Sequence, residues 1–179
     1  MKKFIYILFL ITSALIINGC ITFHKINYEI SITSDSSGNA SVSIYDLRSD
    51  AQGSSALDED IDYLYSYALK SKKFLEQMKL EGKEITDRKV EVSNDTVSGF
   101  LKFNFNSLKA FGNLTFEAGY YILTLSPGDS IIATNGQILS TKNDLRILWE
   151  EETKTISYTL LGNSYEKENF TNLAPYYKK

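Results

Sequence analysis

Alternation of apolar and polar residues is the feature that most limits how this chain can fold. From Ile26 to Thr33 every second residue is apolar, and the pattern returns after residue 89 in short segments separated by turn residues. A period of two is typical of strands that bury one face. Because these segments do not alternate with helical ones, the sequence predicts antiparallel strands and not a parallel sheet.

One segment has a different period. Between residues 57 and 81 acidic residues crowd the start and lysines the second half, an order that complements a helix dipole. Apolar residues recur there at helical spacing, at Ile61, Leu64, Tyr65, Ala68, Leu75 and Met78. We therefore predict an α+β fold: a mostly meandering antiparallel sheet of about eight strands, with one long helix at residues 57–81 packed on one face.

The N-terminal segment has the features of an export signal. Lys2 and Lys3 precede an apolar run from Phe4 to Ile17 that only two polar residues interrupt. The run is shorter than the roughly 20 residues that a transmembrane helix needs, and it fits the core of a signal peptide, which has about 7 to 15. We expect residues 1–19 to be a signal peptide.

The sequence Ile17-Asn18-Gly19-Cys20 resembles the lipobox of bacterial lipoproteins. The resemblance implies cleavage between Gly19 and Cys20, a diacylglycerol on the Cys20 sulfur and an exported protein anchored by lipid in the cell envelope. Ile21 is not the aspartate that retains such proteins at the inner membrane, which favours the outer membrane in a diderm bacterium. An uncleaved N-terminal anchor and an ordinary signal peptide are the alternatives.

Charge and cysteine content limit the mature chain further. Cys20 is the only cysteine, so the fold must rest on core burial without disulfides. Loss of Lys2 and Lys3 leaves 17 basic against 22 acidic residues, a net charge of −5 in place of −3, which argues against a nucleic-acid partner. We predict a lipidated tether at residues 20–25, one α+β domain at 26–162 and a polar, aromatic tail at 163–179, poorly ordered or loosely docked.

The order of elements carries a second resemblance. An early hairpin with an Asp35-x-x-Gly38 turn, a long helix, and late strands containing Leu145, Ile147 and Trp149 resemble the LppM-like envelope lipoproteins. That resemblance implies a role in lipid or glycolipid handling, which is suspected for some members. The chain lacks the C-terminal transmembrane segment that several of them have.

Residues with catalytic or metal-binding chemistry are sparse. His24 is the only histidine, and no cluster has zinc-ligand spacing. The acidic segment 58–62 either holds calcium or simply complements the start of a helix, and Glu150–Glu152 falls at a predicted hairpin tip. We expect no catalytic constellation, no metal site and no cofactor.

Aromatic residues are the most suggestive feature for function. Phe100, Tyr121 and Trp149 are candidates for an apolar binding surface, and core filling is the alternative. The leading hypothesis is a membrane-anchored, non-enzymatic envelope lipoprotein that binds an apolar ligand or lipid, or assists envelope assembly. The second is a structural module that docks another envelope protein through a strand edge or the tail, and the third is an enzyme of unknown type.

Overall fold

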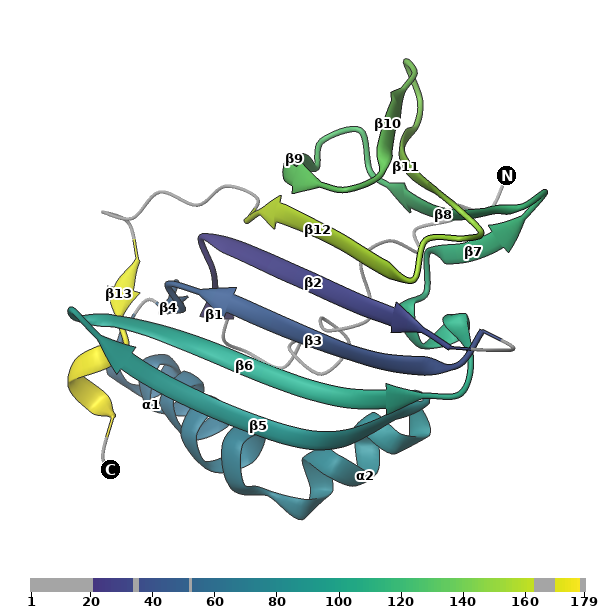
Figure 1. Ribbon diagram of the computed structural model, residues 1–179. Helices are drawn as coiled ribbons and strands as arrows, with labels where there is room; N and C mark the ends of the chain where they lie inside the picture. The colour runs from purple at the N-terminus through teal and green to yellow at the C-terminus, as the bar shows by residue number, and fades with distance from the viewer. Residues whose placement is uncertain (1–20, 34–35, 52, 163–169, 178–179) are drawn as a thin grey trace, which may run out of the picture.

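The computed structural model describes residues 21–33, 36–51, 53–162 and 170–177. All its strand pairings are antiparallel, and the strands form three sheets (Figure 1). The predicted class, antiparallel sheet with helices, is confirmed. The prediction of one meandering sheet of about eight strands is wrong, because segments distant in sequence pair and the strands separate into three sheets.

The largest sheet has six strands. Their order in space is β5 (Lys83–Ser93), β6 (Thr96–Phe105), β3 (Gly38–Tyr45), β2 (Lys25–Ile32), β12 (Thr155–Leu161) and β9 (Ser130–Thr134). The hairpins β2–β3 and β5–β6 are local, whereas β3 pairs with β6 and β2 pairs with β12 across long stretches of sequence.

Two smaller sheets complete the β structure. The four-stranded sheet has the order β10 (Gln137–Ser140), β11 (Leu145–Glu150), β8 (Tyr120–Leu125) and β7 (Leu114–Glu117). The three-stranded sheet has the order β1 (Ile21–Thr22), β4 (Arg48–Ser49) and β13 (Thr171–Asn172). Short 3-10 helices, η3 (Leu108–Phe111) and η5 (Ala174–Tyr176), follow β6 and β13.

The six-stranded sheet has an apolar inner face and a polar opposite face. Ile30 and Val42 point inward and are buried, and they share one core with Ile147 and Trp149 of the four-stranded sheet. The helical segment covers the part of the inner face formed by β5 and β6 (Figure 1). Neither layer covers the opposite face, which we call the open face.

The predicted long helix is interrupted. The structure has α1 (Ser54–Asp62), a π-helical segment η2 (Tyr63–Ala68), and α2 (Lys72–Leu80). Ser71 is extended, and its side chain accepts a hydrogen bond from the Lys73 N–H and so caps α2. Arg88 of β5 donates to the carbonyl oxygens of Ala68 and Ser71, at 2.8 and 3.1 Å, which stabilises the break. A single helix over 57–81 is therefore wrong.

The Asn135-Gly136 dipeptide joins two sheets. Such a pair between two strands usually marks a hairpin, but β9 pairs with β12 and β10 pairs with β11. The Asn135 side chain accepts from Trp149 Nε1 at 2.7 Å and donates to the Thr155 carbonyl at 2.7 Å. Gly136 lies against the Trp149 ring, where an added Cβ would come within 2.6 Å of it.

Ordered structure extends beyond the predicted domain on both sides. Residues 21–25, predicted as a tether, contain β1 and the start of β2. In the predicted tail, Leu173 is fully buried and its carbonyl accepts a hydrogen bond from Tyr65 Oη at 3.0 Å. β1 and β13 pair with β4 from the middle of the chain, so these residues are part of the folded structure. Residues 163–169 and 178–179 lie outside the described part.

Candidate functional site

The predicted lipid attachment and cleavage site, Gly19 and Cys20, lies outside the described residues. The next residue, Ile21, pairs with Ser49 in the three-stranded sheet. A lipid on Cys20 would therefore be followed directly by a strand. Within the described residues no helix has the length and apolar character needed to cross a membrane.

The open face is a grid of small polar side chains. In one row across the strands the register aligns Lys102, Ser41, Glu29 and Ser157. The row beside it aligns Asn104, Asn39, Ser31 and Thr155. Hydroxyl and amide groups both donate and accept hydrogen bonds, so this face suits a polar ligand.

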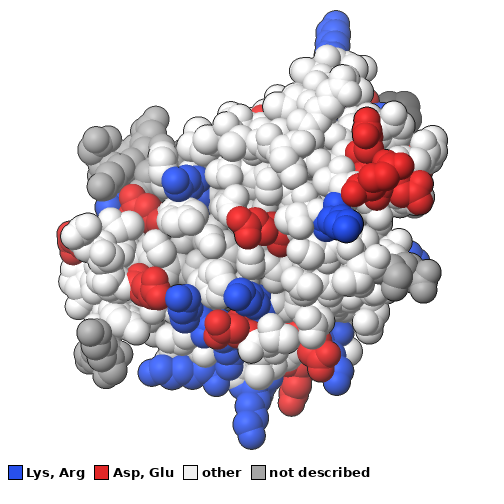
Figure 2. Space-filling view, viewed as in Figure 1, with Lys and Arg blue, Asp and Glu red and all other residues white. Residues whose placement is uncertain are grey.

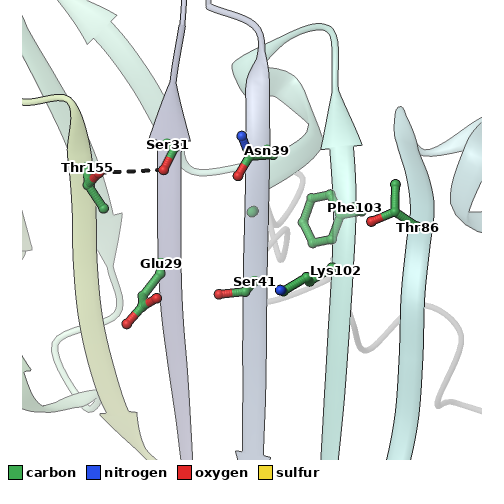
Figure 3. Close-up of a pocket in the computed structure, with 9 residues that line it drawn as sticks. Glu29, Ser31, Asn39, Ser41, Thr86, Lys102, Phe103 and Thr155 are labelled. Carbon is green, nitrogen blue, oxygen red and sulfur yellow. Dashed lines mark hydrogen bonds between the residues drawn. The ribbon is translucent and has the colours of Figure 1, made fainter.

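The centre of the open face is hollowed. The hollow has a volume of about 390 Å³, which is within the range of small-ligand sites. Its lining, drawn in Figure 3, consists of Glu29, Ser31, Asn39, Ala40, Ser41, Thr86, Lys102, Phe103 and Thr155. The register between β5 and β6 shifts between Ile85 and Asp87, which places Thr86 in a bulge at the rim.

Two opposite charges lie on either side of Ser41 in this hollow. Figure 3 shows Lys102 reaching toward Ser41 from β6, with Glu29 beyond Ser41 on β2. Among the described residues neither side chain forms an ion pair. The Lys102 ammonium lies 5.5 Å from the centre of the Phe100 ring, a cation–π distance that restrains its position.

Charges of both signs are distributed over the face seen in Figure 2, with uncharged atoms between them. The nearest basic neighbour of Lys102 on the grid, Lys89, also lies over the Phe100 ring and is paired with Glu91 at 2.7 Å. This mixed pattern suits a ligand that carries both charges better than a polyanion such as a nucleic acid.

The three aromatic residues predicted as an apolar surface do not lie together. Phe100 is half-buried on the open face. Tyr121 and Trp149 are buried between the two larger sheets, and burial raises the pKa of the Tyr121 hydroxyl. The three residues therefore do not share one surface, because the inward residues of β8 and β11 fill the core. The sequence did not single out Lys102 and Glu29, which look like ordinary exposed strand residues.

The other candidate side chains are dispersed. His24 is exposed between β1 and β2, and Glu151 and Glu152 are exposed in the turn after β11. In the acidic segment 58–62, Asp60 points inward while Asp58 is exposed. No group of three or more acidic, histidine or cysteine side chains in the described part of the chain is placed to hold a metal ion.

Asp60 is a buried carboxyl group beneath the three-stranded sheet. Only 2% of it is exposed, and it accepts a hydrogen bond from the Ser49 hydroxyl. Burial raises the pKa of Asp60, the hydrogen bond from Ser49 opposes that shift, and the charges of Asp50 and Glu59 add to it. The folded protein thus holds this proton more tightly than the unfolded chain does.

Replacing Asp60 with asparagine is expected to stabilise the protein at pH 7. The pKa of Asp60 is higher in the folded protein than in the unfolded chain. The free energy of unfolding therefore falls as the pH rises through the range between these two pKa values. Asparagine removes the buried charge and still accepts from Ser49. Urea unfolding should show a higher midpoint for Asp60→Asn than for the wild type at pH 7, and a smaller difference between the two midpoints at about pH 3.5.

Asp58→Asn, which changes an exposed acid on the same helix, is the control. A lower midpoint for Asp60→Asn at pH 7 would contradict this.

A second exposed surface is apolar. The edge strand β10 has no charged residue, and its Ile138 and Leu139 are 48% and 41% exposed. By contrast, the edge strand β5 of the six-stranded sheet is charged and carries Asp87, Lys89 and other charged residues. Uncharged edge strands are prone to pair with another chain.

Comparison of the chain with protein-family models, with curated proteins and with solved structures finds no match.

Proposed function

We propose that this protein is a lipid-anchored component of the bacterial cell envelope that acts by binding a polar envelope component on its open face. The observation that carries the proposal is the asymmetry of the six-stranded sheet. Its inner face is covered by helices and by the four-stranded sheet, whereas its open face carries a polar hollow with Lys102 and Glu29 in it.

The chemistry of the hollow favours a polar ligand over a lipid. Apolar-ligand sites are lined mainly by hydrophobic and aromatic side chains. Most of the side chains that line this hollow are hydroxyl, amide or charged groups. The aromatic residues Tyr121 and Trp149, on which an apolar site was predicted, contribute to the core.

The lipid anchor rests on the lipobox-like sequence that ends at Cys20. Two acyl chains hold a protein firmly at a membrane, whereas one holds it only marginally. Because Ile21 is already part of a strand, such an anchor would keep the domain close to the membrane surface. We place the ligand accordingly among components near that surface.

Docking of a partner strand is a second candidate function. The exposed, uncharged edge at β10 favours it. Added strands bind by main-chain hydrogen bonds along such an edge. The two candidates use different surfaces and can be separated in one experiment.

Site-specific photocrosslinking in producing cells tests both candidates. A photoreactive residue is placed at Ser41 on the open face, at Leu139 on β10, or at the exposed Lys73 of α2 as the control. We expect an adduct in the intact mass of the Ser41 variant and none in the Lys73 variant. An adduct at Leu139 alone would replace the open-face proposal with strand docking. Absence of adducts at both positions would reject both.

A further inference from the structure

The hollow on the open face presents two opposite charges at a fixed spacing. Lys102 on β6 and Glu29 on β2 are both aligned with Ser41 on β3. Neighbouring strands lie about 4.8 Å apart, so the two Cα atoms are about 10 Å apart. Ser41 lies between them, and neither charge is neutralised by an ion pair within the described residues.

The groups between and beside these charges are neutral hydrogen-bonding groups. Ser41 lies between them, and Asn39, Ser31 and Thr155 line the hollow in the next row. The hydroxyls of Ser31 and Thr155 are 3.5 Å apart. Hydroxyls and side-chain amides are suited to the N–H and C=O groups of a peptide.

We propose that the hollow binds a short peptide with free ends, with its carboxylate at Lys102 and its ammonium at Glu29. This rests on the proposed function of the open face and names the ligand class for it. An extended chain advances about 3.3 to 3.6 Å per residue, so a peptide of about three residues matches the roughly 10 Å between the two Cα positions. The peptide groups between the ends face Ser41 and the neutral row beside it.

The position of Lys102 is restrained by its neighbours. Its ammonium lies over the Phe100 ring on one side and reaches toward Ser41 on the other (Figure 3). Its register neighbour on the outer strand, Asp87, makes no ion pair with it. The ammonium is thus held at the rim of the hollow while its charge stays available to a carboxylate.

Calorimetric titration of the protein, as purified from producing cells, tests this with trialanine as the probe. We expect Glu29→Gln and Lys102→Gln each to weaken binding about tenfold, the loss of one charge-assisted contact. N-acetylation of the probe should weaken binding to the wild type equally and abolish the effect of Glu29→Gln. Amidation of the carboxylate of trialanine should likewise weaken binding to the wild type and abolish the effect of Lys102→Gln.

Glu117→Gln and Lys142→Gln remove exposed charges outside the hollow and serve as matched controls. Trialanine that does not bind, or that binds the wild type and both hollow variants equally, overturns the proposal. A crosslink from Ser41 together with either result would reject the peptide ligand and retain the open face as the binding surface. No crosslink from Ser41 would reject the open face itself.

Discussion

Gly136→Ala is expected to lower the free energy of unfolding by about 2 to 3 kcal/mol, one of the two largest effects we predict. The new Cβ would lie 2.6 Å from Trp149 Nε1 and 2.7 Å from Ile147 Cγ2. Neither neighbour can withdraw easily. Ile147 is fully buried, and the Trp149 ring is held by its hydrogen bond to Asn135 and by packing on the Tyr158 ring, whose centroid is 6.1 Å from that of Trp149.

Thermal unfolding measures this effect. For a domain of this size a loss of 2 to 3 kcal/mol corresponds to a fall in Tm of roughly 5 to 10 °C. Gly128→Ala is the matched control, because Gly128 has no positive φ and nothing within 4 Å of its added Cβ. If both variants melt at the wild-type temperature, the close contact between Gly136 and Trp149 does not constrain the fold as described.

Cys20→Ser is expected to remove nearly all of the protein from its membrane-anchored, processed form. The substitution eliminates the only thiol that can carry a diacylglycerol. Each buried CH₂ contributes about 0.8 kcal/mol to membrane binding, so loss of both acyl chains would remove the proposed anchor. The variant should accumulate as an unprocessed precursor or be released from the membrane.

Fractionation with detection of precursor and mature forms checks this result. Ser13→Ala, within the apolar run but outside the lipobox-like sequence, is the control and should behave as the wild type. Normal cleavage and membrane retention of Cys20→Ser would show that the anchor is not a lipid on this residue.

Strand positions were predictable from the sequence because alternation is a local property. The alternating residues of β2, β3, β6 and β12 do form strands, and their apolar positions do face the core. The pairing order was not predictable in the same way. Contacts such as β2 with β12 depend on which distant segments bury their faces together.

Local sequence patterns did not predict the structure correctly where contacts with residues distant in sequence determine it. The helical pattern across 57–81 gave no sign of the break at Ser71, because part of its support is Arg88 on β5. Asn135-Gly136 is typical of a hairpin turn, but the two strands that flank it belong to different sheets. β9 pairs with β12, and β10 pairs with β11. The three-stranded sheet, built from two-residue strands, has no periodicity to detect.

The candidate site was only partly predictable. Alternation along β6 puts Phe100 on the face opposite to Leu101 and Phe103, which is the open face of the structure. Lys102 and Glu29 are common residues on exposed strands, and only the register across β6, β3 and β2 aligns them on either side of Ser41. Tyr121 and Trp149 could not be distinguished from surface aromatics without knowing that a second sheet covers them.

The intact mass of the protein purified from the membrane fraction tests lipid anchoring most directly. We predict a chain that begins at Cys20 and carries the added mass of a diacylglyceryl group on that residue, with or without an acyl group on its amine. A chain that begins at Met1 or at any residue other than Cys20, or one with an unmodified Cys20, would contradict the lipid-anchored function.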